Sequence, residues 1–468
     1  MSHDEGHGGI QPARPAHYRR ACLPATALLL SGVLVAGCTG SSGHPATKAT
    51  AGPALSAAGP SCLTPPASSC LAPHQFRVAY GIQSLLNSGT DGRGETVTVL
   101  GPPNQPNQGG AGAPTATASP SSRTPQSRGA PATTDIRQDL AAFDRMFRLP
   151  AAHIQAVSTL AGAASAWQAS AQEVQDAEIV HAVAPDATLR VVPLPADVLD
   201  SDATATADLI AGVRLAVSGT DVAAIGWSLG EHFFSHAQAA ELHAILRRAA
   251  RHHVTVVGAS GDNGAVSEAY GGSPVKEVSL PASDPLVLAA GGTKLTANPS
   301  TGSYVSETTW NGAVGSASVT PGASGGGFSH LYSRPAYQDG VHGIATMRGV
   351  PDVAGDASDL GGLPIVMASG NQSSVSTAPS TGAAAALWAG LMALADQQAG
   401  HGLGLVNPAI YRIARGSRYH QAFHDITTGN NLTLGPVNDV YHAGPGWDPV
   451  TGWGSPNAQV LIPLLARG

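Results

Sequence analysis

The chain has 468 residues, of which 43% are hydrophobic, so it can bury a sizeable core as one large or two ordinary α/β domains. Charged residues make up 12% of the chain and the formal net charge is −7, which argues against a nucleic-acid-binding surface. Aromatic residues are also few, at 5%, so a protein that stacks nucleic-acid bases is not expected.

The N-terminus has the pattern of an export signal. Arg19 and Arg20 precede an apolar run over 21–36, which is too short for a typical transmembrane helix. Val-Ala-Gly then stands directly before Cys38, and this resembles a bacterial lipobox, in which the cysteine is lipidated. We therefore expect residues 1–37 to be a lipoprotein signal peptide and the protein to be anchored at the extracellular face of the cell membrane. An ordinary secretory signal, and a secreted protein, is the alternative.

Residues 38–73 are rich in Ser, Gly, Pro and Ala, a composition typical of a flexible tether. Cys62 and Cys70 form an even pair once Cys38 is lipidated, so outside the cytoplasm we expect a disulfide between them; two free thiols are the alternative. The folded domain is expected over 74–468.

The folded domain begins with a helical segment around Ala79-Tyr80-Gly81-Ile82 and a first strand over 96–100. A low-complexity Pro/Gly/Ser/Thr segment at about 101–134 is predicted to be a surface insertion, and the helical pattern returns at Asp135. Apolar strands then alternate with helices, which predicts a mostly parallel sheet with helices on both faces. The strands are predicted near 189–194, 222–230, 254–262 and 286–292, and the intervening helices near 204–218 and 237–251.

The segment Ser380–Leu394, with the sequence STGAAAALWAGLMAL, has no charged residue. A helix of this composition is apolar on every side, so it belongs in the core and begins at a tight Ser-Thr-Gly turn. Its N-terminal end presents backbone N–H groups and a positive dipole at one point inside the protein. The simplest interpretation of this pattern is a core helix.

TGAAAALWAGLMALADQ resembles the nucleophile helix of the sedolisins, the serine-carboxyl peptidases. Further segments match that family in the same order: SGDNG near 260–264, LPASDP at 280–285, WNG at 310–312 and SGGGFS at 324–329. The resemblance implies a single large subtilisin-like α/β domain. Sedolisins normally carry a large N-terminal prodomain, and the tether leaves no room for one, so its absence is expected.

Two positions of the sedolisin catalytic site are altered in this sequence. With the register set by LWAGL, Gly382 stands where the nucleophilic Ser belongs, and Gln172 stands at the general-base position. Asp176 and the oxyanion-stabilising Asp262 are retained. Gln172 and Asp176 are four residues apart on one helix, so both can face the Gly382 turn. Ser380 lies two residues before Gly382 and is expected to point elsewhere.

The resemblance also implies binding residues, which fall in three segments of the C-terminal half. It implies peptide-binding residues at Ser324, Gly325, Gly326 and Gly327, and a Ca²⁺ site formed by Asp425, Ile426, Gly444, Gly446 and Asp448. Carboxylate and carbonyl oxygens are the ligands that Ca²⁺ prefers, and glycines allow carbonyl groups to turn inward. Loops of Gly and Asp without a metal are the alternative.

The sequence therefore favours a monomeric, lipid-anchored sedolisin homologue that no longer cleaves peptides and holds a peptide or protein in the former substrate groove. An amide at position 172 cannot accept a proton from a nucleophile, and Gly382 supplies no hydroxyl. One alternative is an acid-acting endopeptidase that uses Ser380 or a realigned Glu173. Another is a structural protein of the cell envelope.

Overall fold

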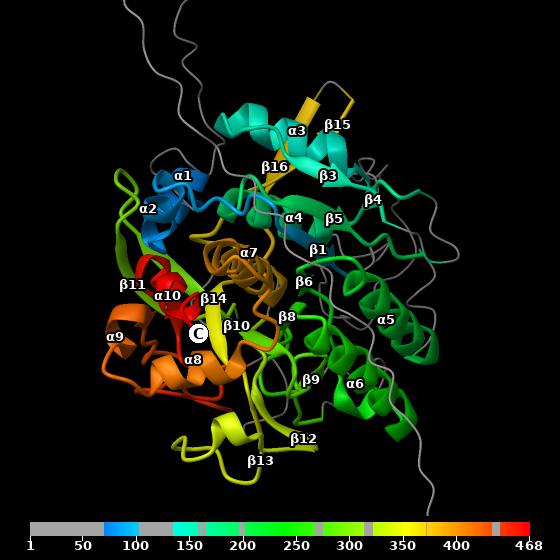
Figure 1. Ribbon diagram of the computed structural model, residues 1–468, viewed down its shortest axis with the longest axis vertical. Helices are drawn as coiled ribbons and strands as arrows, with labels where there is room; N and C mark the ends of the chain where they lie inside the picture. Colours follow the sequence, from blue (N-terminus) through cyan, green and yellow to red (C-terminus); the bar gives the residue numbers. More distant parts are fainter. Residues whose placement is uncertain are drawn as a thin grey trace, which may run out of the picture. The chain divides into compact units, whose positions relative to one another are not determined.

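The computed structural model describes residues 70–102, 134–157, 160, 165–195, 202–266, 275–312, 322–370, 372–432 and 440–468 (Figure 1). All of them belong to one compact unit. The predicted signal peptide, the lipidation site Cys38, Cys62 and most of the predicted insertion lie outside these residues. Within the described ranges, no helix has both the length and the apolar composition needed to cross a membrane.

The core of the fold is a mostly parallel sheet with the strand order β11-β10-β8-β6-β1-β5-β3, and β14 pairs with β10. β11 is the antiparallel strand at one edge. The strands are β1 (Thr96–Leu100), β3 (His153–Gln155), β5 (Thr188–Val191), β6 (Val222–Ile225), β8 (Thr255–Ala259), β10 (Leu288–Ala297), β11 (Tyr304–Thr309) and β14 (Val353–Asp356).

The helices are α1 (Pro73–Ala79), α2 (Ile82–Asn87), α3 (Ile136–Phe147), α4 (Ala171–Val183), α5 (Asp202–Ala216), α6 (His236–Arg251), α7 (Thr381–Ala399), α8 (Asn407–Ala414), α9 (Tyr419–Ala422) and α10 (Ala458–Leu465), with short 3₁₀ turns η2 (Glu231–Phe233) and η3 (Ala336–Gln338). Five small two-stranded sheets complete the described fold. They pair β2 (Thr134–Asp135) with β4 (Gln168–Ala169), β7 (Leu229–Gly230) with β9 (Ser279–Leu280), β12 (Gly327–Ser333) with β13 (Met347–Val350), β15 (Ile365–Ser369) with β16 (Gln372–Ser376), and β17 (Phe423–His424) with β18 (Ser455–Pro456).

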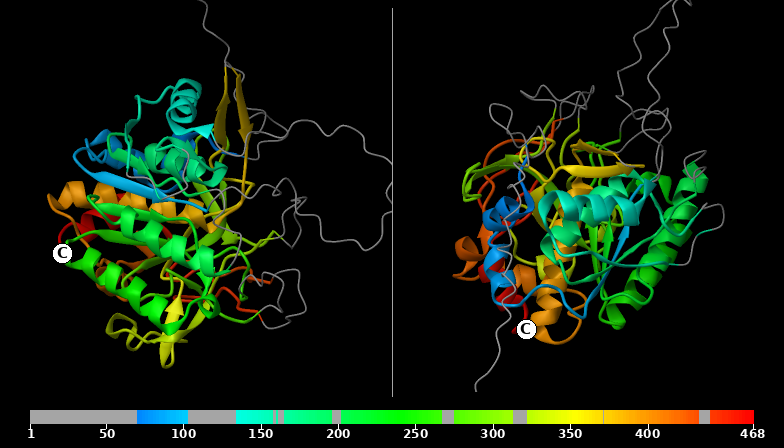
Figure 2. Two further views of the ribbon diagram at one scale, coloured as in Figure 1. Left: turned by 90° about the vertical axis from the view of Figure 1, so that its right-hand side faces the viewer. Right: turned by 90° about the horizontal axis from the view of Figure 1, so that it is seen from above.

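Helices cover both faces of the main sheet, as the sequence predicted. Figure 1 and Figure 2 show α4 and α7 on one face and α5 and α6 on the other. Alternate residues of β6 point to the two faces: Val222 and Ala224 pack with α4 and α7, and Ala223 and Ile225 pack with α5 and α6. Because both faces are buried, the strands need continuous apolar runs rather than an alternating pattern.

The central helix α7 is the element that the apolar segment predicted. Ser380 is its N-cap, and Gly400 ends it in the left-handed conformation with a φ of 74°. Its residues from Thr381 to Asp396 are buried, and it contacts β1, β6, β8, β10 and β14. A Cβ on Gly390 would overlap Val183, so this glycine allows α7 to lie close against α4. The start of α7 is therefore held in a fixed position above the sheet.

The structure differs from the sequence-based boundaries at the start of the domain. Cys70 and Leu71 are already buried, and the Leu71 N–H donates to the Gly362 carbonyl at 2.9 Å. The packed domain thus includes residues that the sequence assigned to the tether. Cys70 is disulfide-bonded. The predicted entry helix is divided into α1 and α2 because Gly81 adopts a left-handed φ of 70° between them.

Candidate functional site

The four predicted catalytic positions meet at the N-terminal end of α7. Gln172 and Asp176 lie on consecutive turns of α4, which packs along α7. Gly382 is the second residue of α7, and Asp262 lies in the loop that follows β8. The carboxyl ends of parallel strands and the N-termini of helices thus converge where sequence reasoning placed the site.

Gly382 stands where a nucleophilic side chain would enter this site. A Cβ built on Gly382 would lie 3.0 Å from Gln172 Nε2 and 3.2 Å from Asp176 Oδ1. This geometry confirms that Gln172 and Asp176 both face the Gly382 turn. The Gln172 amide donates to Gln175 Oε1 at 3.0 Å and, more weakly, to Asp176 Oδ1 at 3.4 Å. These side chains close around the Cα of Gly382 and leave little free space there.

The prediction that Ser380 points elsewhere is wrong. Its Oγ lies 3.1 Å from the Cβ position of Gly382, and it accepts a hydrogen bond from the Gly382 N–H at 3.0 Å. The reason is the N-cap conformation: an extended backbone, with φ of −166° and ψ of 144°, turns the hydroxyl back over the first helical turn. Ser380 is buried and serves as the cap of α7.

Asp262 is also engaged with the start of α7. Its Oδ1 accepts hydrogen bonds from the Thr381 N–H and the Thr381 hydroxyl, both at 2.8 Å. Ser380 supplies the acceptors for the next two N–H groups, its hydroxyl for Gly382 and its carbonyl for Ala383. The protein's own groups therefore occupy the first N–H donors of α7, which are the donors that could otherwise stabilise an oxyanion.

Asp176 lacks the partners that an ionised carboxylate needs. It is fully buried, and in the described part of the chain its Oδ2 has no hydrogen-bond partner. That oxygen packs directly against Gly226, where no side chain could fit. Burial raises the pKa of Asp176 to about 8; the Gln172 hydrogen bond lowers it and the charge of Asp262 raises it further. Asp176 therefore holds its proton at acid and neutral pH and cannot act as a base there.

The neighbouring acid Glu173 faces away from this site. Its Oε2 accepts from the Ser170 N–H at 2.7 Å, and the Ser170 hydroxyl accepts from the Glu173 N–H at 3.1 Å, so the two residues form the capping box of α4. Its side chain packs against Gly101, and burial raises its pKa to about 8. Use of Glu173 as a base would require the start of α4 to unwind. Glu178, the next acid, accepts instead from the Val366 N–H.

The predicted peptide-binding glycines support the fold as well as a pocket. The Gly325 N–H donates to Gly261 O at 2.7 Å, and a Cβ on Gly325 would overlap the Ser260 carbonyl. A Cβ on Gly326 would overlap the Pro449 carbonyl in the same way. The Ser324 hydroxyl donates to Val450 O at 2.8 Å and accepts from Gly292 N–H at 2.9 Å. Ser324 and these two glycines thus allow loops of this chain to meet.

Gly326 and Gly327 open onto a pocket of about 160 Å³. Phe328, Met347 and Tyr441 form its apolar wall, and the Phe328 and Tyr441 rings meet edge to face with centroids 5.8 Å apart. Just before this pocket, the Gly325 N–H donates to the Gly261 carbonyl. The next residue, Asp262, accepts a hydrogen bond from the Thr381 N–H at the start of α7. The pocket is therefore connected to the Gly382 turn by a short chain of hydrogen bonds.

The residues predicted to bind Ca²⁺ come from two loops that the structure brings together. Gly446 N–H donates to both oxygens of Asp425, at 3.2 and 3.1 Å, and Gly444 N–H donates to Asp448 Oδ2 at 3.3 Å. Burial raises the pKa of Tyr419, and the Asp425 and Asp448 charges raise it further, so both carboxylates lie near that side chain. Burial raises the pKa of Asp448 to about 6.

This donor set fits a hard cation. In the described structure, the carbonyl oxygens of Ile426, Gly444 and Gly446 accept no backbone hydrogen bond. Gly446 has a φ of 77°, a conformation that glycine adopts readily. Across the described ranges, no three side chains of His, Cys, Asp or Glu are grouped as a metal site. Backbone carbonyls would therefore have to supply most of the ligands.

Sequence reasoning missed Gln175. Its amide accepts from Gln172 and donates to the Ala378 carbonyl at 2.8 Å, so it connects α4 to the segment that leads into α7. Gln175 is three residues from Gln172, a spacing that predicts contact on one helix, but the partner at Ala378 lies far away in the sequence. It also missed Gly226, on which Asp176 packs.

The fold and site define a subtilisin-like α/β protein, with a nucleophile position at the N-terminus of a buried helix. The solved structure of Pseudomonas sedolisin, a serine-carboxyl proteinase complexed with two molecules of pseudo-iodotyrostatin, superimposes with a TM-score of 0.65 at 23% identity, covering 84% of this chain and 97% of that one. At this identity the similarity shows the fold.

Two curated relatives are similar in sequence. Kumamolisin of Bacillus sp. (strain MN-32) is 34% identical over 303 residues, which is 62% of this chain and 51% of the relative. Sedolisin of Pseudomonas sp. (strain 101) is 34% identical over 214 residues, which is 45% of this chain and 35% of the relative. The chain thus spans about half the length, or less, of these relatives. No family model matches the chain. Sequence and fold agree in their similarity to the sedolisin family of peptidases, and together they support that family for this chain.

Proposed function

We propose that this chain is a non-catalytic sedolisin homologue that binds extended peptide segments beside the former catalytic site. The observation that carries the proposal is the centre of the site: Gly382 has no hydroxyl, and the side chain beside it is the Gln172 amide, which cannot accept a proton. Asp176 cannot replace the base, because burial raises its pKa to about 8. Nucleophile and base act as one unit, so their joint loss removes turnover.

The pocket beside Gly327 supports peptide binding. It is walled by Phe328, Met347 and Tyr441 and lies at the start of β12, a strand that pairs with β13 in a sheet of two strands. An extended peptide can add to such an edge through backbone hydrogen bonds while one side chain enters the pocket. A peptide held in this way would remain intact.

To test this, the full-length chain is incubated with a library of extended peptides, and bound peptides are identified by mass spectrometry. We expect intact peptides to be recovered, and Tyr441→Ala to weaken their binding by removing one wall of the pocket. Val305→Ala, at an exposed position on β11, is the matched control and leaves binding unchanged. A substitution at Gly326 is unsuitable because it would disturb the contact with Pro449. If no peptide binds, the structural role in the cell envelope replaces this proposal.

One observation favours an acid-acting endopeptidase as the second candidate: Ser380 Oγ lies 3.1 Å from the Cβ position of Gly382. The hydroxyl is buried and accepts the Gly382 N–H, and Glu173 is held in the capping box of α4. A nucleophile without a base beside it is weak. Cleaved rather than intact peptides, with cleavage abolished in Ser380→Ala, would favour this candidate.

We also propose that Ca²⁺ is held between the loops of Asp425 and Asp448. The carbonyl oxygens that accept no backbone hydrogen bond support this metal site.

The location of the protein also forms part of the proposal. We propose that lipidation at Cys38 anchors the chain at the extracellular face of the membrane, and the lipobox-like sequence Val-Ala-Gly-Cys supports this anchor. In cell fractionation, Cys38→Ser should release the protein from membranes. A substituted chain that stays in the membrane fraction would contradict the anchor.

A further inference from the structure

The outward face of α6 combines a small-residue half with a cationic half. The buried face of the helix consists of Ala239, Leu242, Leu246 and Ala249. On the opposite side lie the exposed residues Ala237, Ala240, Ala244, Arg247, Arg248 and Arg251. The alanines are short, so the arginine side chains can reach past them to a surface that lies flat against the helix.

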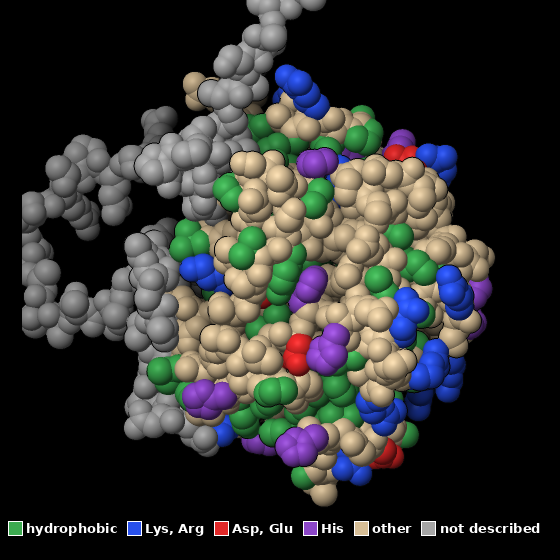
Figure 3. Space-filling view, turned by 90° about the vertical axis from the view of Figure 1, so that its left-hand side faces the viewer, with side chains coloured by type: hydrophobic (Ala, Val, Ile, Leu, Met, Phe, Trp, Pro, Cys, Tyr) green, Lys and Arg blue, Asp and Glu red, His purple; other side chains and the backbone are tan. Residues whose placement is uncertain are grey.

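The three arginines are not paired with the exposed acid of the same helix, Glu241, which pairs with Arg214 at 2.5 Å. Across the described residues, Arg247, Arg248 and Arg251 take part in no ion pair. No Asp or Glu occurs between Glu241 and Asp262 in the sequence. Figure 3 shows Lys and Arg side chains gathered along the right-hand edge of one face, where few acidic groups are visible.

A buried acid holds a histidine on this face. His243 Nδ1 lies 2.8 Å from Oδ2 of Asp284, which is fully buried, and the Leu286 N–H donates to the other oxygen of Asp284 at 2.9 Å. The hydrogen bond to Asp284 raises the pKa of His243, against the effects of burial and of Arg247. Asp284 thus holds the imidazole with its other nitrogen turned away from the acid. His243, Arg247 and Arg251 follow one another at four-residue spacing along α6.

Local stability explains only part of this arrangement. The helix dipole favours Arg248 and Arg251, which lie in the last turn of α6, but not His243, which lies two turns before its end. Like charges four residues apart, as at Arg247 and Arg251, destabilise a helix. The chain as a whole carries a formal charge of −7, so a cluster of positive charge on one helix gives the domain a preferred orientation toward an anionic surface.

We propose that the outward face of α6, formed by His243, Arg247, Arg248 and Arg251, binds the anionic phospholipid surface of the membrane. This inference rests on the membrane-anchored location proposed above, which keeps the domain close to lipid headgroups. A basic surface adds electrostatic attraction to anionic lipids beside such an anchor and orients the domain on the membrane. Each basic side chain near an anionic membrane strengthens binding roughly fivefold at moderate salt.

The test is co-sedimentation of the full-length, unlipidated chain with vesicles of phosphatidylcholine, with or without phosphatidylglycerol. The variant Arg247→Gln/Arg248→Gln/Arg251→Gln is compared with the control Arg145→Gln/Arg412→Gln/Arg418→Gln, which removes the same charge from exposed positions on other elements. We expect the α6 variant to lose binding to phosphatidylglycerol vesicles by roughly tenfold or more, and the control variant to bind like the unmodified chain. Binding of the unmodified chain should weaken as salt is raised.

Equal binding of the two variants, or binding that does not depend on phosphatidylglycerol, would overturn the inference. Binding to soluble polyphosphate but not to the vesicles would also overturn it, because it would assign the face to a phosphate polymer. Using the unlipidated chain separates the α6 test from the test of the lipid anchor. Release of Cys38→Ser from the membranes of cells tests the anchor, and co-sedimentation of the unlipidated chain with vesicles tests α6. Apolar binding through the N-terminal segment is common to both variants and cancels in their comparison.

Discussion

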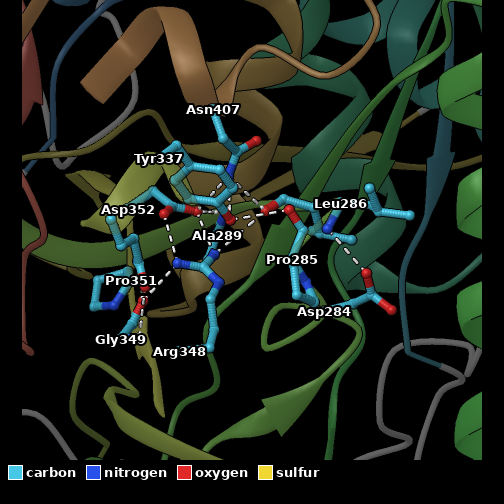
Figure 4. Close-up of polar contacts among 12 residues, drawn as sticks. Asp284, Pro285, Leu286, Ala289, Tyr337, Arg348, Gly349, Pro351, Asp352 and Asn407 are labelled. Atoms are coloured by element: carbon cyan, nitrogen blue, oxygen red, sulfur yellow. Dashed lines mark hydrogen bonds and ion pairs between the residues drawn. The ribbon is translucent and has the colours of Figure 1, made fainter. Parts of the chain in front are cut away.

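Two fully buried aspartates show how differently this fold treats a carboxyl group. Asp352 receives five donors: two nitrogens of Arg348 at 2.7 and 2.6 Å, the Tyr411 hydroxyl at 2.8 Å, the Ala289 N–H at 2.9 Å and Asn407 Nδ2 at 3.0 Å (Figure 4). Asp176 receives one weak contact from Gln172 and has an oxygen without a described partner. Asp352 thus has a cationic partner and a complete set of donors, whereas burial without such a set raises the pKa of Asp176.

The comparison bears on the proposed loss of catalysis at the Gly382 turn. Burial opposes the charge of Arg348, but the Asp352 carboxylate keeps the pKa of Arg348 above its usual value. Asp352, which directly precedes β14, thus links β13 to α8 through Arg348, Asn407 and Tyr411. In the described structure Asp176 forms no ion pair, and the charge of its neighbour Asp262 opposes its ionisation.

The largest expected effect follows from removing the Asp352 carboxylate from its set of donors. Asp352→Asn leaves the buried guanidinium of Arg348 without its counter-charge, which should lower the free energy of unfolding by about 3–5 kcal/mol. Asp176→Asn replaces a protonated carboxyl by an amide of similar shape and removes the cost of keeping it protonated, so it should not lower the free energy of unfolding at neutral pH. Denaturant unfolding of the two variants measures the difference. Equal destabilisation would show that Asp176 is ionised and paired.

Calcium should sharpen the comparison by adding a counter-charge to Asp425 and Asp448, whose donors are backbone N–H groups and hydroxyls. Ca²⁺ at about a hundred times its dissociation constant should raise the free energy of unfolding by about 2.7 kcal/mol. Asp448→Asn should remove this gain. Asp339→Asn, at an acid that pairs with Arg334 on the surface, is the control and should retain it. Thermal unfolding with calcium and with a chelator measures the effect, and identical melting curves would contradict the site.

The pH dependence is the third test. Asp176 has a folded-state pKa of about 8, above the usual value of about 4 in an unfolded chain. The folded state therefore binds the proton more tightly, so the stability from this group is complete below about pH 4 and is lost as the pH rises toward 8. Asp176→Asn should flatten this part of the profile. A variant whose profile matches the unmodified chain would show that Asp176 does not titrate there.

The sequence predicted the elements that local pattern controls. The uncharged segment after Ser380 can only be a core helix, and the apolar runs at 222–230 and 254–262 require a sheet covered on both faces; β6, β8 and α7 confirm both. The four-residue spacing of Gln172 and Asp176 was sufficient to place both at the Gly382 turn.

The remaining features depend on contacts between distant segments. The hydroxyl of Ser380 points into the site because its backbone is extended, and a sequence does not specify that angle. Position 326 requires glycine because a Cβ there would overlap the Pro449 carbonyl. The pKa of Asp176 is raised by burial, to which its packing on Gly226 contributes. Each of these partners lies at least 50 positions away in the sequence, so no local pattern signals it.

A peptide-cleavage assay tests the central claim most directly. The unmodified chain, Ser380→Ala and Gly382→Ser/Gln172→Glu are incubated with one peptide library at acid and neutral pH, and products are quantified by mass spectrometry. The Ser380 variant loses a helix cap worth about 1 kcal/mol, so its folding is checked first. We predict no cleavage by the unmodified chain or by Ser380→Ala, and trace cleavage at most by the double variant. Cleavage by the unmodified chain that disappears in folded Ser380→Ala would contradict the account.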